Sequence, residues 1–300
     1  MSVSSFHTHT RLCKHASGVP GDYVRAAEAF AEPCSALGFS DHCPYPDGAW
    51  AGSRMRADQL DEYARLVREA ASDAPFPVRY GFECEWYPAY ESWYRDFLLG
   101  ECGAEYLVYG AHWVRDAGEF IYIPDAAIPR LLRPYVKLTC QGIASGLYSF
   151  MAHPDILLAG YHSLTPDVRA ACVDIIDAAV DASLPLEING LGMTRPRVPG
   201  DRGLRYQYPV REFWELAAER GARIICSSDA HRPEDATAYA VNARDFALSI
   251  GIECEDAGEV LLPFMGPARF GARNDGMASA VSAVSSASTL PGGSPSLPAR

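Results

Sequence analysis

Histidine is concentrated where this chain could bind metal. The segment SFHTHTRLCKH, residues 5–15, contains His7, His9 and His15, three of the eight histidines in the sequence. His7 and His9 alternate, so on a β-strand both side chains would point to the same side. A neutral imidazole costs little to remove from water and offers a nitrogen ligand to zinc and similar metals. The spacing indicates a metal site, with a solvated surface loop as the alternative.

Seven short apolar segments have the composition of β-strands, and amphipathic segments lie between them. The expected strands cover residues 2–6, 37–41, 78–83, 106–111, 147–152, 185–189 and 222–229, and helical patterns cover 22–37, 57–71, 89–101, 166–182 and 209–221. Strand, helix and strand repeated in this way imply parallel strands joined by crossover helices. Seven such units favour an α/β fold with a closed barrel over an open sheet.

Histidines and carboxylates follow the C-terminal ends of these expected strands. The segments SDH, GFECE, GAH, AHPD and SSDAH add His42, Glu83, His112, His153, Asp229 and His231 to the first three histidines. In a parallel barrel the strand C-termini form the face on which active sites assemble. A single histidine there would more often be structural, but seven are hard to explain by packing. The remaining one, His162, is expected on the surface.

Seven imidazoles and two carboxylates are too many ligands for one tetrahedral zinc ion, which takes about four. We therefore expect two or three divalent ions. Closely spaced ions generate hydroxide near neutral pH, bind substrate oxygens and neutralise charge on a leaving oxygen. This chemistry suits the hydrolysis of phosphate esters, amides or lactones.

The composition is that of a soluble globular protein with a formal net charge of −12. Negative charge disfavours nonspecific binding to nucleic acid and to anionic membranes. The chain shows neither a membrane span nor a signal peptide, and its nine cysteines never occur in C-x-x-C spacing, so we expect reduced thiols in the cytoplasm. Residues 1–265 are expected to form the barrel, and the Ser-, Ala-, Gly- and Pro-rich residues 266–300 a disordered tail.

The ordered motifs over roughly residues 5–235 resemble those of the polymerase and histidinol phosphatase (PHP) superfamily. That pattern is H-x-H, a following His, a His after strand two, G-x-E, two single His residues and a terminal D-x-H. The resemblance implies a distorted seven-stranded (β/α)7 barrel with a trinuclear site for zinc, iron or manganese. It implies one ion held by His7, His9, Glu83 and Asp229, a second by Glu83, His112 and His153, and a third by His15, His42 and His231.

Within that superfamily, the motifs SDHCP, HPD, LEIN and SSDAH, with the pair Tyr208 and Pro209, resemble the monofunctional histidinol-phosphate phosphatases. The resemblance implies a phosphomonoesterase that hydrolyses L-histidinol phosphate in histidine biosynthesis. Those phosphatases often have a basic residue shortly after HPD, where this chain has Leu157, Leu158 and Ala159. Another small phosphate ester or a cyclic phosphodiester is therefore the alternative substrate. The negative net charge disfavours a nuclease. A metal-binding module without catalytic turnover is the non-enzymatic alternative.

The loop after the sixth strand is the candidate site for the phosphate group. It contains Arg195, Arg197, Arg202 and Arg205. A guanidinium group matches the geometry of phosphate oxygens, so we expect Arg195 and Arg197 to clamp the phosphate of a small substrate. A solvated basic loop is the alternative. Arg54 and Arg232 are the next candidates for binding the phosphate. The sequence leaves the oligomeric state open.

Overall fold

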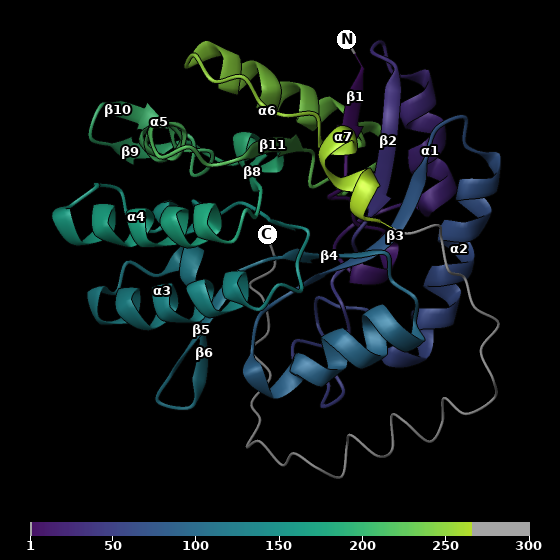
Figure 1. Cartoon of the computed structure of the whole chain (residues 1–300), viewed down its shortest axis with the longest axis horizontal. Helices are drawn as coiled ribbons and strands as arrows, with labels where there is room; N and C mark the ends of the chain where they lie inside the picture. The colour runs from purple at the N-terminus through teal and green to yellow at the C-terminus, as the bar shows by residue number, and fades with distance from the viewer. Residues whose placement is uncertain (1, 266–300) are drawn as a thin grey trace.

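The computed structural model describes residues 2–265, and the tail expected over residues 266–300 lies outside the described residues. Seven parallel strands form one sheet in the order β1-β2-β3-β4-β7-β8-β11 (Figure 1). All seven expected strands are present: β1 (Val3–Ser5), β2 (Cys34–Phe39), β3 (Val78–Cys84), β4 (Tyr106–Tyr109), β7 (Phe150–Met151), β8 (Leu186–Asn189) and β11 (Ile224–Ser227).

Backbone contacts just beyond β1 and β11 bring the first and last strands together. Thr8 and Ala230 form a parallel bridge, and the His9 amide donates to the Ala230 carbonyl over 2.8 Å. The Ser228 amide donates to Ser5 Oγ over 3.0 Å. The sheet is therefore a nearly closed ring, and the predicted distorted (β/α)7 barrel is confirmed.

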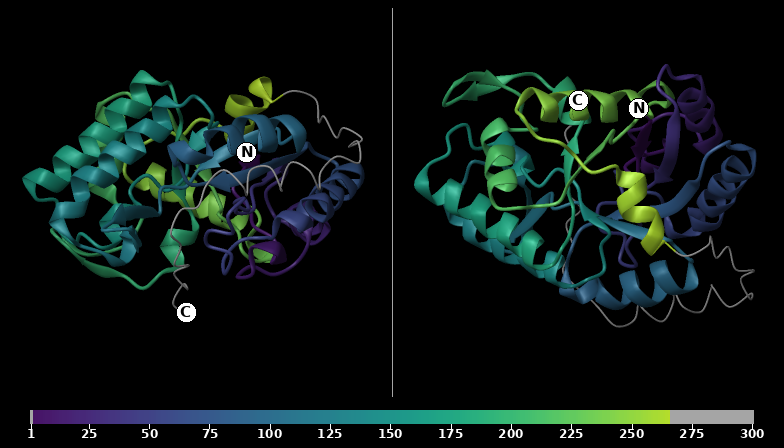
Figure 2. Two further views of the ribbon diagram at one scale, coloured as in Figure 1. Left: turned by 90° about the horizontal axis from the view of Figure 1, so that it is seen from below. Right: turned by 45° about the horizontal axis from the view of Figure 1, so that its top comes forward.

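Helices cover the outside of this barrel, as Figures 1 and 2 show. Helices α1 and α2 lie beside β1–β3, and α3, α4 and α5 lie on the opposite side. The helices are α1 (Pro20–Ala29), α2 (Leu60–Asp73), a π-helix (Trp93–Glu101), α3 (Pro129–Ala144), α4 (Pro166–Asp181), α5 (Arg211–Glu219), α6 (Ala238–Ser249) and α7 (Ala257–Leu261). None of the helices within residues 2–265 is long and apolar enough to cross a membrane.

Two hairpins are additions that the apolar pattern did not predict. Strands β5 (Trp113–Asp116) and β6 (Glu119–Tyr122) follow β4, and β9 (Val198–Gly200) and β10 (Gly203–Arg205) follow β8. Both insertions begin at strand C-termini, so they build the walls of the same end of the barrel.

The helix expected over residues 22–37 is wrong in its second half. Helix α1 ends at Ala29, and Cys34 already pairs with Val3 as the first residue of β2. Pro33 lacks an amide hydrogen and disfavours helical backbone before it. Its carbonyl instead accepts from the Val3 amide over 3.0 Å. Sheet pairing has overridden the helical periodicity that continues into residues 34–37.

Alternation along the strands divides the core into two parts. Tyr106 and Val108 of β4 belong to a small apolar cluster. The other members on strands, or directly after a strand, come from β1, β2, β7 and β11: Phe6, Ala36, Phe150, Ala152 and Ile225. Leu107 and Tyr109 belong to the larger cluster that includes helix residues. The small cluster therefore fills the barrel. Helix α7 packs against it from the end opposite to the strand C-termini, since Glu255, just before α7, donates its amide to the Ile224 carbonyl.

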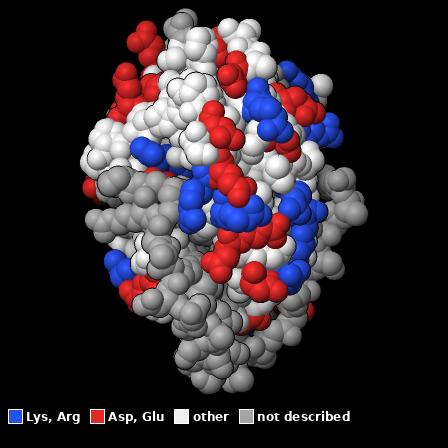
Figure 3. Space-filling model, turned by 90° about the vertical axis from the view of Figure 1, so that its right-hand side faces the viewer, with Lys and Arg blue, Asp and Glu red and all other residues white. Residues whose placement is uncertain are grey.

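The charged surface is mixed where the described residues are visible in Figure 3. Lys and Arg side chains lie among Asp and Glu side chains on that face instead of forming a continuous basic stripe. Arg65 and Glu69 on α2, for example, form an i,i+4 ion pair with a separation of 2.7 Å.

Tyr106 provides a test of the barrel packing. Its hydroxyl donates to the Phe6 carbonyl over 2.9 Å, and a Cβ atom at Gly81 would lie 2.5 Å from the Tyr106 ring. Gly81→Ala should therefore lower the free energy of unfolding by about 1–3 kcal/mol through overpacking. Urea denaturation measures this change. Gly52→Ala is the control, because a Cβ there meets open space; equal midpoints for both variants would contradict the packing account.

Candidate metal centre

The nine predicted ligands converge at the C-terminal end of the barrel, around the Glu83 carboxylate. They are His7, His9, His15, His42, Glu83, His112, His153, Asp229 and His231. Glu83 is only 1% exposed, and its Oε1 atom lies 3.3 Å from His153 Nε2 and 3.6 Å from His112 Nε2. Its Oε2 atom lies 2.8 Å from His42 Nδ1 and 3.5 Å from Nε2 of both His7 and His9.

Asp229 provides a second carboxylate next to the first histidine pair. Its Oδ1 atom lies 3.1 Å from His9 Nε2 and 3.4 Å from His7 Nε2. His231 stacks on His9 with 4.4 Å between the ring centroids. The ring centroids of His15 and His231 are 4.9 Å apart. The exposed His162 lies on the surface, as predicted.

The backbone is strained at two of these positions. His153 and Asp229 have φ angles of 31° and 52°, in the left-handed region that non-glycine residues rarely occupy. The His153 amide donates to Glu187 Oε2 over 3.0 Å, and Asn189 Nδ2 donates to Asp229 Oδ2 over 3.1 Å. These contacts help to hold the strained conformations, which aim both side chains into the cluster.

Two buried glutamates orient the histidines from behind. Glu187 Oε1 lies 2.9 Å from His7 Nδ1, and Glu85 Oε1 lies 2.7 Å from His112 Nδ1. In both rings the opposite nitrogen, Nε2, faces Glu83. Carboxylates that bind the far nitrogen of a histidine fix its orientation and raise its basicity toward a metal.

Sequence reasoning identified only part of this supporting layer. In the sequence, Glu85 is compatible either with orienting a ligand or with a solvated position, and its 2% exposure supports the first alternative. Asp41 faces His9 and not the neighbouring His42, with 3.7 Å between Asp41 Oδ1 and His9 Nδ1. Glu187 was missed altogether, although a glutamate in the middle of the buried segment LEIN was the signal that could have identified it.

Burial and neighbouring charges shift the pKa values of the candidate ligands. Burial, with His231 nearby, lowers the pKa of His15 to about 4, and burial, with His9 nearby, lowers that of His231 to about 4. Burial opposes ionisation of Glu83, but the surrounding histidines outweigh it and hold the pKa of this carboxyl well below its ordinary value. Burial opposes protonation of His7 and His112, but the nearby carboxylates outweigh it and raise the pKa of both rings. Metal ions bind neutral imidazoles and ionised carboxylates, so metal binding here would release protons from these two rings.

The unpaired polar atoms test whether these residues fit a metal. Buried atoms without a hydrogen-bond partner include His7 Nε2, His9 Nε2, Glu83 Oε1 and Asp229 Oδ1. Buried polar atoms are normally paired, because leaving them unpaired costs about 1–3 kcal/mol each. Three compact sets, His7–His9–Glu83, His7–His153–Asp229 and Glu83–His112–His153, each place possible ligand atoms within 4.8 Å of one another. The donor set therefore fits divalent metal ions.

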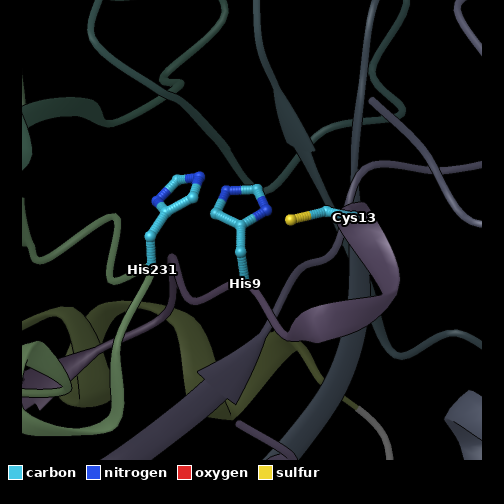
Figure 4. A group of neighbouring side chains, drawn as sticks. All are labelled: His9, Cys13 and His231. Carbon is cyan, nitrogen blue, oxygen red and sulfur yellow. The ribbon is translucent and has the colours of Figure 1, made fainter. Parts of the chain in front are cut away.

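The buried Cys13 lies beside the cluster. Figure 4 shows its sulfur pointing toward the His9 ring, with His231 on the other side of that ring. Possible ligand atoms of Cys13, His9 and His231 all lie within 4.8 Å of one another. Burial and the charge of Asp41 raise the pKa of the Cys13 thiol well above its ordinary value, so the thiol remains protonated without a metal.

A cavity of about 610 Å³ opens onto the histidine cluster. Its wall contains seven of the nine predicted ligands together with Arg195, Tyr208, Arg232, Asp235 and Tyr239. Arg195 is hydrogen-bonded to the Tyr208 hydroxyl, and the Tyr208 ring lies 5.9 Å from that of His153. The cavity therefore combines the candidate metal ligands with a guanidinium group.

The structure separates Arg195 from the other arginines of its loop. Arg197 lies over the Tyr206 ring, 4.2 Å from its centroid, and is not among the residues that line the cavity. Arg202 pairs with Glu215, and Arg205 donates to four backbone carbonyls. Arg54 is buried and contacts Glu85 over 3.4 Å. Only Arg195 and Arg232 remain as arginines in the described cavity wall.

Comparison with known proteins identifies the family of this chain. The PHP domain model matches residues 5–190, so the chain belongs to the PHP domain family. Among its relatives is a protein of Deinococcus radiodurans named "Probable histidinol-phosphatase". The two are 31% identical over 234 residues, which cover 76% of this chain and 85% of the relative.

Two solved structures share the fold. Histidinol phosphate phosphatase of Lactococcus lactis, solved with zinc, L-histidinol and phosphate, is 13% identical and superimposes with a TM-score of 0.62. The match covers 84% of this chain and 95% of that one. The Listeria monocytogenes protein hisK is 20% identical, with a TM-score of 0.59 over 77% of this chain and 96% of its own.

Metal content tests the ligand set. We expect two to three divalent ions per chain, and Glu83→Ala or His153→Ala should lose both metal and activity, because these two residues contribute to several of the sets. Elemental analysis of purified protein measures the stoichiometry. His162→Ala should retain full metal content, since His162 is exposed and remote from the cluster. A fully active preparation with at most one ion per chain would rule out the multinuclear site.

Proposed function

We propose that this chain is a metal-dependent phosphomonoesterase that hydrolyses L-histidinol phosphate to L-histidinol and phosphate. The observation that carries the proposal is the group of buried, unpaired ligand atoms opening into one cavity beside Arg195. Support comes from the histidinol-phosphatase name of the Deinococcus relative and from the Lactococcus structure with L-histidinol and phosphate. The nine cysteines are free, in keeping with a reducing cytoplasm.

In this proposal the nine histidine and carboxylate side chains hold two or three ions of zinc, manganese or iron. Bound there, divalent ions supply an activated water and neutralise charge on the phosphoryl oxygens. Glu83 lies among five imidazoles and would hold metal together with them, while Glu187 and Glu85 keep His7 and His112 in the required orientation.

Arg195 and Tyr208 act on the phosphoryl group from the cavity wall beside the candidate ligands. The guanidinium is positive at all relevant pH values and can bind two phosphate oxygens at once. Burial raises the pKa of Tyr208 far above neutrality, so its hydroxyl stays protonated and is able to donate a hydrogen bond. Donors fixed in advance stabilise charge that redistributes in the transition state more than charge in the ester.

A panel of phosphate esters tests the substrate. Protein reconstituted with manganese, zinc or iron is assayed on L-histidinol phosphate, a sugar phosphate and a cyclic phosphodiester. We expect the highest kcat/KM on L-histidinol phosphate. A comparable or higher value on another ester would overturn the substrate assignment, and absence of phosphate release from every ester at full metal occupancy would support a binding module.

Arg195→Ala should lower kcat/KM about a hundredfold, or about 3 kcal/mol, because it removes a charged donor to the phosphoryl group. Metal content should be unchanged, and Arg195→Lys should restore only part of the activity, since an ammonium cannot bind in two-pronged geometry. Steady-state kinetics measures both variants.

Arg197→Ala is the variant to compare with Arg195→Ala, because Arg197 belongs to the same loop but lies over the Tyr206 ring. Arg169→Ala, an exposed position on α4, is the neutral control. If Arg195→Ala behaved like Arg169→Ala, the phosphate would be held elsewhere, with Arg232 next to test.

A further inference from the structure

The cavity wall contains a carboxylate that the metal site does not use. Among the described residues, three carboxylates line the cavity: Glu83, Asp229 and Asp235. Glu83 and Asp229 face the histidine cluster at 2.8–3.6 Å. Asp235 ends the short 3-10 helix Pro233–Asp235, which begins two residues after His231. It therefore belongs to the cavity but not to the proposed ligand set.

Asp235 is held in place by neighbours on both sides. The Tyr239 hydroxyl is hydrogen-bonded to the Asp235 carboxylate, and Tyr239 also lines the cavity. The Tyr239 backbone lies so close to Gly190, just after β8, that a Cβ atom on Gly190 would collide with it. Pro233 also packs tightly on Gly18, where a Cβ atom would lie 2.7 Å from the proline ring. The carboxylate is thus presented to the cavity by packed backbone.

The bond from Tyr239 leaves Asp235 with unused capacity. An ionised carboxylate has about four lone-pair positions and can only accept hydrogen bonds. One hydroxyl donor occupies one of these positions. The remaining positions are available to a donor in the cavity, and a cationic donor binds a carboxylate more strongly than a neutral one.

The proposed reaction requires a partner for such a carboxylate. An ester of an amino alcohol carries a phosphate dianion and, near neutral pH, a protonated amine. The phosphate end is accounted for by the candidate metal ligands and Arg195. The ammonium end needs an anion in the same cavity, and Asp235 is the one described carboxylate of the wall outside the proposed ligand set.

We propose that Asp235 binds the protonated amine of the substrate and so selects phosphate esters of amino alcohols over sugar phosphates and other neutral-alcohol esters. This inference rests on the proposed phosphatase function and specifies the substrate class of its cavity. Tyr239 is the positioning residue, because its hydroxyl orients the carboxylate.

Two substrates and two variants test this assignment. Asp235→Asn and Glu234→Gln each remove one negative charge, and Glu234 is an exposed neighbour that does not line the cavity. Each variant is assayed, as full-length metal-loaded protein, on L-histidinol phosphate and on imidazolylpropyl phosphate, the same ester without its amine. Because both substrates are measured on one preparation, a partly misfolded variant lowers both rates and leaves their ratio unchanged.

Wild type should prefer L-histidinol phosphate over the des-amino ester, and Asp235→Asn should lower kcat/KM for L-histidinol phosphate alone by about 10- to 100-fold, as for loss of a charged hydrogen bond. Asp235→Glu should restore part of the preference, and Glu234→Gln should behave like wild type. Equal losses on both esters, or no loss on either, would overturn the role of Asp235 while leaving the phosphatase function intact. Failure of wild type to hydrolyse either ester would overturn the function itself.

Discussion

The architecture of the site depends on keeping the buried Glu83 carboxylate ionised. An ionised carboxylate removed from water is stable only if positive charge or several donors compensate it. Its two oxygens face five imidazole nitrogens at 2.8–3.6 Å, yet Oε1 accepts no hydrogen bond among the described residues. Hydrogen bonds alone therefore leave the Glu83 carboxylate partly unpaired. The same arrangement of oxygen and nitrogen atoms suits a set of metal ligands. Glu187, Glu85 and Asp41 reinforce this arrangement, because they lie at the far nitrogens of His7, His112 and His9.

The barrel brings the ligands of this cluster together from different strands. Each strand alternates between the two cores, so a residue one position further along the strand reaches the barrel interior. On β8, Leu186 and Ile188 belong to the outer core, and Glu187 and Asn189 therefore face inward. Beyond the strand ends this alternation no longer constrains the backbone. His153 and Asp229 adopt left-handed conformations there, and hydrogen bonds to Glu187 and Asn189 help to hold both.

Much of this arrangement could be predicted from the sequence, because the ligands have rare residue types at fixed places along the chain. Seven apolar segments and the polar residues that follow them indicate the positions of the strands and the face of the site. Glu187 could not be assigned, because its role depends on which face of β8 points inward and on the distance to His7. Arg195 and Arg197 could not be separated, since the loop conformation alone puts one in the cavity wall and the other over Tyr206. The first half of β2, residues 34–36, was also missed, because pairing with β1 is a long-range effect.

The charge of the whole protein says little about what this cavity binds. A net charge of −12 is spread over a surface on which acidic and basic groups alternate in the view of Figure 3. At physiological ionic strength such surface charges are screened beyond about 8 Å. The cavity instead presents local charges in a low-dielectric wall: a cation-binding histidine and carboxylate cluster, two arginines and the separate Asp235 carboxylate. A ligand that carries both a phosphate dianion and an ammonium group matches this separation of charge, which a neutral-alcohol ester would satisfy only in part.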